Sequence, residues 1–501
     1  MPELPADPAT RDALATMQRL ASELRLRQPA IQRRMDYYRG QHPLVYASDE
    51  FAHYMGDRFA GFSDNWCPPV VQTVAERIDV RGIRLDDDAV RPDEDLARAW
   101  RRADCERGFS EAVTVMLAAA RSYALVWADP DDETEPVVTW ERPDQAIVAY
   151  RPETGRPVSA LKLWADEDAG YEYATLYTRD TVWKFQRPGV AQLVRYEPRP
   201  AVDPTGGWEP RQPPGDDTWP IPNPMGMIPL VELRNQTLLD DAPISDIDGV
   251  IAMQDAINLV WAYLMNALDY ATLPQRVVTG ADMPKVPVLD ATGQPVGERP
   301  LDLDTLVQER ILWIPDADAR TAEWSAARLD VFSAVIERAI EHIAAQTRTP
   351  PHYLIGKLVN LSAEALTAAD AGQVSKAGER ITYATPGVRR VFALMAKVLG
   401  DDRKASAALS GQVVWKDIQY RSLAQLVDAL VKLRQIGMPL EWVMEQYGLE
   451  PHEVQRVTRM RDEELAADPI GAIAAEMGRA TGPTTTPTGQ TDTEIAAVDG
   501  V

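Results

Sequence analysis

Residues 245–280 read SDIDGVIAMQDAINLVWAYLMNALDYATLPQRVVTG. Mostly apolar residues recur in this stretch at helical spacing and fall on one broad side, which predicts a long helix with a buried face. That side carries Ile247, Ile251, Gln254, Ile257, Trp261, Leu264 and Leu268. Ser245 is placed to cap the N-terminus of the helix, with Asp246 and Asp248 in the first turn, where the helix dipole favours carboxylates. Pro274 ends the helix.

Three carboxylates of the same stretch form a second pattern. Asp248, Asp255 and Asp269 are separated by 7 and 14 residues, so in a continuous helix they fall close to one line. In a monomer this line is simply the solvent face of a surface helix. In a ring whose hole the helix lines, the same line would present negative charge to anything that passes through. Both interpretations remain open at this point.

The chain after this helix alternates between short β-rich runs and further helices. Residues 275–315 contain apolar runs separated by Gly and Pro, which predict a small β-containing insert. A second amphipathic helix is expected from the spacing of Leu329, Phe332, Ile336, Ile340 and Ile343. Pro350 and Pro351 should end it. From Ser362 a helix is expected to continue past a kink at Pro386 to Gly400, about 57 Å if straight, a length typical of a large assembly.

The chain before this helix predicts helices followed by a β-rich unit. Helical spacing runs from Ala9 to Arg39 with a break at Pro29, and a second helical stretch covers about 93–121. Between 122 and 185, six short runs rich in β-branched and aromatic residues are divided by turn-forming clusters, which indicates one antiparallel unit. Helical patterns return over 422–464, and the polar tail after them should be disordered.

Composition limits the classes of function. The 501 residues hold 52 Lys and Arg against 76 Asp and Glu, a formal net charge of −24, which argues against tight sequence-nonspecific binding of nucleic acid. The length predicts about three structural units. The longest uncharged apolar stretch, 256–268, is too short to span a membrane, and no secretory signal precedes the first helix. Cys67 and Cys105 are expected to be ordinary buried thiols.

Motifs of common enzymes are missing. Gly356-Lys357 is not part of a P-loop, the histidines share no metal-ligand spacing, and no nucleophile elbow occurs. We therefore expect no catalytic residues, no metal and no cofactor. The acidic runs Asp86–Asp88 and 129–135 could in principle hold a divalent cation for a nuclease or hydrolase. Charged, solvated loops explain them more simply.

Several segments in order resemble the portal proteins of tailed bacteriophages. They are YYRGQHPL at 37–44, NWCPPVVQTVAERIDVRGI at 65–83, the β-rich unit from Ser122, NPMGMIPLVELRNQ at 223–236, the stretch 245–280, RTPPHYLIGKLVNLSAEALTAAD at 348–370 and the helical end at 426–454. The resemblance covers residues 36–454. It implies an α+β subunit with a mixed wing, a two-helix stem, a small β-containing clip, a long kinked helix and a helical crown, which assembles into a ring.

The resemblance also implies an assignment for each region. The expected parts are a wing region over 1–244 with its β-rich unit at 122–236, stem helices at 245–273 and 326–347, a clip at 274–315, a tunnel loop at 349–361, the long kinked wing helix at 362–400, a crown at 422–464 and a disordered tail at 465–501. In the tunnel loop, Tyr353, Lys357 and Asn360 would be the candidates for touching the DNA backbone. Asp248, Asp255 and Asp269 would form the acidic stripe of the channel.

The implied function is a structural one. The protein would not be an enzyme: it would form a homo-oligomeric ring, usually a dodecamer, at one capsid vertex of the virion after assembly in the host cytoplasm. Double-stranded DNA would pass through without sequence specificity during packaging and ejection. The expected partners are the terminase large subunit, head-completion or adaptor proteins, and the major capsid and scaffolding proteins, with no membrane. The alternatives are a metal-dependent nuclease or hydrolase and another oligomeric virion structural protein.

Overall fold

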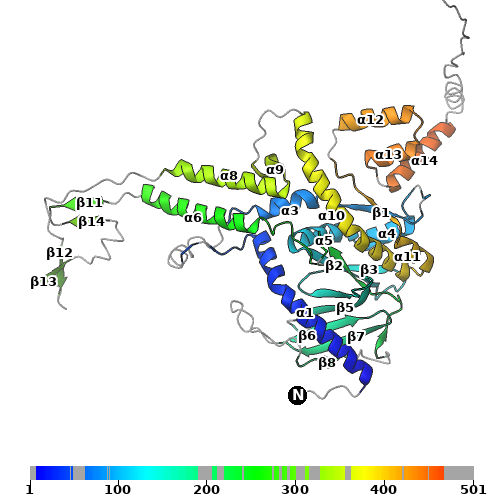
Figure 1. The fold of residues 1–501 in the computed structure, drawn as a ribbon, viewed down its shortest axis with the longest axis horizontal. Helices are drawn as coiled ribbons and strands as arrows, with labels where there is room; N and C mark the ends of the chain where they lie inside the picture. Colours follow the sequence, from blue (N-terminus) through cyan, green and yellow to red (C-terminus); the bar gives the residue numbers. More distant parts are fainter. Residues whose placement is uncertain are drawn as a thin grey trace, which may run out of the picture. The chain divides into compact units, whose positions relative to one another are not determined.

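The structure of the protein is a computed structural model, and it divides the chain into two compact units, Met1–Gln419 and Tyr420–Val501. It describes residues 7–45, 47–48, 63–86, 88–89, 91–166, 168–189, 206–211, 219–239, 242–272, 276–280, 285–289, 294–300, 311–314, 328–355, 363–419, 423–449 and 451–467. Helices and open sheets are mixed along the first unit, which confirms the expected combination of α and β structure (Figure 1).

A six-stranded antiparallel sheet forms one layer of the first unit. Its strand order is β4-β5-β6-β7-β8, and β9 pairs with β7. The strands are β4 (Ala146–Tyr150), β5 (Pro157–Asp166), β6 (Tyr171–Tyr177), β7 (Thr181–Pro188), β8 (Glu209–Pro210) and β9 (Ile221–Pro222). Helix α1 (Pro8–Arg39) packs on this sheet, with Met17 and Leu20 in the same buried cluster as Leu161 and Phe185. The helical spacing of the N-terminal apolar residues thus serves to cover a sheet.

A three-stranded antiparallel sheet, in the order β10-β2-β3, lies at the main core of the unit. Its strands are β2 (Arg121–Ala128), β3 (Pro136–Glu141) and β10 (Leu230–Arg234), and the surrounding helices are α3 (Cys67–Ala75), α4 (Glu94–Arg102) and α5 (Cys105–Ala119). A short antiparallel pair, β1 (Val80–Arg84) with β15 (Gln412–Trp415), joins distant parts of the chain. Trp100 stacks on Phe392 at the centre of this core, with ring centroids 4.9 Å apart.

The long helix α10 (Ala363–Val398) passes directly over the three-stranded sheet and is followed by α11 (Asp402–Ala408). Its approach depends on Gly387, because a Cβ at this position would lie 2.5 Å from Cδ2 of Leu233 and 3.1 Å from the carbonyl oxygen of Glu232. Only a glycine leaves room for the helix backbone at this distance from strand β10.

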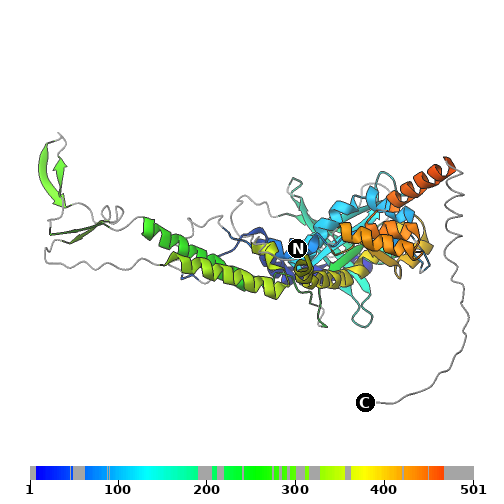
Figure 2. The same ribbon diagram turned by 90° about the horizontal axis from the view of Figure 1, so that it is seen from above.

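Helices α6 (Ile251–Thr272) and α8 (Leu329–Thr347) lie side by side (Figures 1 and 2). Ile336, Ile340 and Ile343 of α8 are buried, as their spacing predicted. The chain between the two helices carries β11 (Arg276–Thr279), β12 (Lys285–Leu289), β13 (Pro295–Pro300) and β14 (Ile311–Ile314). Strand β11 pairs in parallel with β14, and β12 pairs in antiparallel with β13. The predicted β-containing insert is therefore present.

The short helix α9 (Pro351–Ile355) follows α8. The second unit consists, in its described part, of α12 (Leu423–Gln435), α13 (Leu440–Tyr447) and α14 (Pro451–Ala467). These three helices cover the region 422–464 in which helical patterns were expected. Residues 468–501, most of the predicted tail, lie outside the described residues. No helix in the described part of the chain is long and apolar enough to cross a membrane.

The prediction of a break at Pro29 is wrong. Helix α1 continues through Pro29, an exposed residue, so water can solvate the carbonyl that loses its N–H partner.

The six β-rich runs form antiparallel strands in two sheets: β2 and β3 pair with β10, whereas β4 to β7 form a sheet of their own. Residues of both sheets, such as Tyr123 of β2 and Ala160 of β5, share one buried cluster. Strand β10 follows β2 by more than one hundred residues, and no local sequence pattern predicts their pairing.

Other differences concern helix boundaries. The stretch predicted as one helix over 93–121 is divided at Asp104, which has a left-handed backbone with φ of 50°. Helix α8 ends at Thr347, the predicted last residue, because Arg348 is left-handed with φ of 55°, so the helix stops before Pro350 is reached. Pro351 instead begins α9, a position that suits its fixed φ. Cys67 and Cys105 are free and buried, as expected.

Candidate functional site

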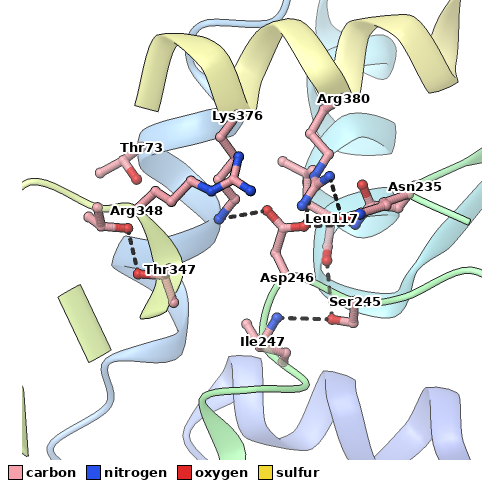
Figure 3. Close-up of polar contacts among 12 residues, drawn as sticks. Thr73, Leu117, Asn235, Ser245, Asp246, Ile247, Thr347, Arg348, Lys376 and Arg380 are labelled. Carbon is pink, nitrogen blue, oxygen red and sulfur yellow. Dashed lines mark hydrogen bonds and ion pairs between the residues drawn. The ribbon is translucent and has the colours of Figure 1, made fainter. Parts of the chain in front are cut away.

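A buried ionic cluster lies where the segment before α6, the end of α8 and helix α10 meet (Figure 3). At its centre is the carboxylate of Asp246, whose side chain is fully buried. Oδ1 of Asp246 accepts hydrogen bonds from Nδ2 of Asn235 at 2.8 Å and from Nε of Arg380 at 3.0 Å. Oδ2 lies 2.9 Å from Nζ of Lys376. One carboxylate thus holds two cations of α10 against the start of the α6 segment.

The local chain places Asp246 by using its neighbour Ser245. The hydroxyl of Ser245 donates to the carbonyl oxygen of Ala118 at 2.5 Å, and the N–H of Asp246 donates to that of Leu117 at 3.0 Å. The carbonyls of Leu117 and Ala118 lie at the C-terminal end of α5, where no N–H group of the helix donates to them. The chain at Ser245 and Asp246 is therefore fixed to α5 before α6 begins, and residues 246–250 form turns. This is why the helix predicted from 245 begins at Ile251.

Cations exceed carboxylates in this cluster. Besides Lys376 and Arg380 it contains Arg348, and the carboxylates among the described residues of the cluster are Asp246 and Glu379. Burial lowers the pKa of Lys376 below its ordinary value; Asp246 opposes this effect, and the positive charges of Arg380 and Arg348 add to it. The charged ammonium is therefore only partly compensated within the protomer.

The same residues line a pocket of about 200 Å³. Its lining is polar and includes Gln236, Thr347, Arg348, Lys376 and Arg380. Figure 3 shows the long side chains of the three cations gathered around Asp246. The pocket can therefore accept a group that carries negative charge and oxygen acceptors.

A second buried cation, Arg77, holds helix α9 in place. Its side chain is 1% exposed and donates to the carbonyl oxygen of Ile418 at 3.1 Å and to the hydroxyl of Tyr353 at 3.1 Å. It also lies 3.4 Å from Oδ2 of Asp370. Arg77, which follows α3, connects that helix to α9 and α10, because its planar guanidinium group can donate to several acceptors at once.

A polar cluster ties α1 to α6. Oη of Tyr37 donates to Oδ1 of Asp255 at 2.6 Å, and the Tyr37 carbonyl oxygen lies 3.1 Å from Nε2 of His42. Gln254, the residue before Asp255 in α6, accepts a hydrogen bond through its side-chain oxygen from the N–H of Trp66 at 2.8 Å. Burial is the main cause that raises the pKa of Asp255, and hydrogen bonding to Tyr37 opposes it. These contacts fix the base of α6 to the N-terminal helix.

Comparisons with known proteins show the family of the chain. A family model described as phage portal protein, SPP1 Gp6-like, matches residues 18–467. The chain belongs to this phage portal protein family. Two proteins named portal protein, from Mycobacterium phages D29 and L5, are 26% and 25% identical to this portal protein over 417 and 418 residues. Each of these matches covers 80% of this chain and 79% of the relative.

Solved structures of low similarity also match the portal protein. One comes from the neck of a native GTA particle computed with C12 symmetry: identity is 14%, the TM-score is 0.37, and 81% of this chain and 95% of that chain are covered. A second, from the neck of an empty GTA particle computed with C6 symmetry, has 17% identity, a TM-score of 0.39 and the same coverages. The family match and the named relatives establish a structural connector of the phage head.

The described residues include two of the three carboxylates of the predicted acidic stripe, and both have partners within the protein. Asp248 lies in the turn before α6, where Arg34 contacts both its carboxylate oxygens at 2.8 and 2.7 Å. Asp255 is only 3% exposed and bonded to Tyr37, so the expectation that it faces a channel is wrong for this residue. Asp269 lies in α6, and its side chain is outside the described residues.

The predicted tunnel-loop residues are only partly visible. Tyr353 is half-buried in α9, and its hydroxyl accepts from Arg77. Lys357 and Asn360 lie outside the described residues. The described part of the chain thus shows an anchoring contact at the start of this segment.

The acidic runs have local roles in the described residues. Asp132 accepts from the N–H of Thr134, and Arg102 pairs with both Asp132 and Glu135 beside the turn between β2 and β3. Within the described ranges, no group of three or more His, Cys, Asp or Glu side chains could hold a metal ion. Asp87 lies outside them.

The buried ionic cluster was missed at the level of sequence. Asp246 was assigned to the first turn of a helix, and Lys376 and Arg380 were simply part of a long helix. A signal was available, because these two cations are four residues apart on the side of α10 that also carries buried Ala377 and Ala384. Two charges on an apolar face indicate a buried partner.

Proposed function

We propose that this portal protein is one protomer of a ring, a dodecamer as is usual in its family, through which double-stranded DNA passes at one capsid vertex of the virion. The carrying observation is the pair α6 and α8, which lie side by side, are joined by a β-containing insert and are fixed to the body by buried polar contacts. Two helices and a small insert, held on a larger mixed unit, suit a stem and a clip.

The remaining regions are assigned on the same basis. Residues 1–244 form the wing, α10 is the long wing helix, and α12 to α14 belong to the crown. The clip, which includes β11 to β14, is the surface for the terminase large subunit and later the head-completion or adaptor proteins. Major capsid and scaffolding proteins would surround the ring, which is assembled in the host cytoplasm. The protomer contributes no catalysis, and the packaging motor is a separate protein.

The net charge of −24 supports passage of DNA without retention, because few excess cations are available to hold phosphates. Within the segment 349–361, Lys357 and Asn360 are the proposed contacts to the DNA backbone. Tyr353 is proposed to anchor this segment through its bond with Arg77. Asp269 remains the candidate for an acidic channel wall, since Asp248 is paired and Asp255 is buried.

Negative-stain imaging of the purified full chain tests the proposal. Class averages viewed down the particle axis should show rings with a central hole of about 20 Å or more, enough for duplex DNA. Monomers at micromolar concentration in the presence of scaffolding and capsid partners would contradict a ring. Solid particles without a channel would instead indicate another oligomeric structural protein of the virion.

A further inference from the structure

The pocket beside Asp246 is lined by more cations than carboxylates among its described residues. Among the described side chains, Arg348, Lys376 and Arg380 pair with two carboxylates, Asp246 and Glu379, so in this described set the positive charges outnumber the negative ones by one. Lys376 and Arg380 are 5% and 6% exposed. Buried charges are stable when each is paired, and an excess cation facing a pocket favours a bound anion.

Arg348 is held over this pocket at a cost in backbone energy. Its φ of 55° is left-handed, a conformation that glycine or asparagine adopts more easily than a long side chain. Its Nη1 lies 3.6 Å from Glu379, while its side chain is 57% exposed. Because a left-handed backbone is unfavourable for arginine, the presence of Arg348 at this position suggests that its side chain has a functional role. A simpler role is also available, because a cation at the C-terminus of α8 is favoured by the helix dipole.

The size of the pocket limits the ligand. Its volume of about 200 Å³ is below the roughly 300–1,000 Å³ of pockets that enclose whole small molecules, so it has room for the end of one side chain. A DNA duplex carries its phosphates on a wide convex surface, and such a surface cannot bring a phosphate to side chains as buried as Lys376 and Arg380. A carboxylate on a flexible side chain can enter.

We propose that this pocket binds the carboxylate of an Asp or Glu side chain from a second copy of this chain, with Arg348 at the entrance and Lys376 and Arg380 behind it. A second copy can supply such a carboxylate, since the chain has 76 Asp and Glu residues against 52 Lys and Arg. The proposal rests on the proposed ring, because it needs copies side by side. It adds to the ring a defined ionic contact at the junction of α8 and α10.

Substitution of Arg348 separates its roles. Arg348→Gly removes the charge and suits the left-handed backbone, so the single chain should unfold at an unchanged or higher temperature. Its self-association should nevertheless weaken at least about tenfold, because a partly buried charge pair is lost. Arg348→Lys keeps the charge and should restore most of the association. Arg338→Gln is the matched control, since it removes a positive charge from an exposed position of the same helix and should change nothing.

Sedimentation velocity of the full chain over a series of protein and salt concentrations measures these effects. Carbodiimide crosslinking of a mixture of isotopically heavy and light copies supplies an independent readout. We expect a peptide containing Lys376 joined to an acidic peptide of the opposite label. The contact with Asp246 inside one copy can give only products of a single label.

The outcomes separate the two proposals. If the wild type does not self-associate, both the ring and this contact are wrong. If Arg348→Gly assembles as the wild type does and no mixed-label product forms, the ring stands and the inter-copy carboxylate is wrong. The DNA probe is a duplex of about 30 base pairs, which spans a few helical turns. If Arg348→Gly assembles normally but loses the salt-dependent binding of this duplex, the ligand is a DNA phosphate and the proposal is overturned.

Discussion

The hydroxyl of Tyr37, at the end of α1, donates a hydrogen bond of 2.6 Å to the carboxylate of Asp255, in the second turn of α6. The two residues are 218 positions apart in the chain, and both are nearly fully buried. Arg34, one turn earlier in α1, pairs with Asp248. The N-terminal helix is therefore part of the support of the proposed stem, and substitutions in it should be felt there.

Tyr37→Phe should destabilise the first unit by about 1–3 kcal/mol, because a buried carboxylate loses its donor. Chemical denaturation of the full chain, followed by tryptophan fluorescence, measures the change. Tyr38→Phe is the control, since among the described residues the hydroxyl of Tyr38 has a long, exposed contact of 3.5 Å with Gln72. Equal effects of the two substitutions would show that the bond to Asp255 contributes nothing of its own.

Asp255 should make stability depend on pH in a definite direction. Its pKa is raised above 3.8 in the folded protein, chiefly by burial, so the folded state binds the proton more tightly than the unfolded state. The contribution is fully present below pH 3.8 and is lost as the pH rises through the elevated pKa. Asp255→Asn, which stays neutral, should therefore gain stability relative to the wild type as the pH rises. A free-energy difference that is constant from pH 3.5 to 7 would contradict the raised pKa.

Gly387→Ala should destabilise the protein by about 1–3 kcal/mol although alanine favours helices, because the added Cβ would overlap Leu233. Gly372→Ala in the same helix is the matched control. Its Cβ would meet nothing closer than 3.8 Å, so helix propensity should stabilise the protein by up to about 1 kcal/mol. Thermal unfolding of both variants measures the opposite signs. The same sign in both would mean that α10 does not approach β10 this closely.

Arg77→Met should destabilise the first unit by about 3–5 kcal/mol, because Asp370 loses its buried cation and the carbonyl of Ile418 loses a donor. Amide hydrogen exchange should also become faster over Pro351–Ile355, where Tyr353 loses its bond to Arg77. Arg98→Met, an exposed cation beside Asp95, should leave both readouts unchanged. Normal protection of α9 in Arg77→Met would contradict the anchoring role of Arg77.

Most helices of the described chain could be predicted because their causes are local. The apolar spacing of α8 and the proline start of α3 follow from neighbouring residues, whereas the passage of α1 through Pro29 was not predicted. The sheet arrangement could not be predicted in the same way. Strand β10 joins β2 across more than one hundred residues, and such pairing depends on which faces meet after folding.

The sequence by itself determined the mixed helix and strand content, the negative net charge and the two amphipathic helices that flank a β-containing insert, since periodicity and charge are properties of short segments. Only the tertiary structure decided which charges are exposed. Asp255 was expected on a channel face and is buried under Tyr37, whereas Asp246, Lys376 and Arg380 form a buried cluster. A charge can be buried wherever the fold supplies a partner, and that partner lies far away in the chain.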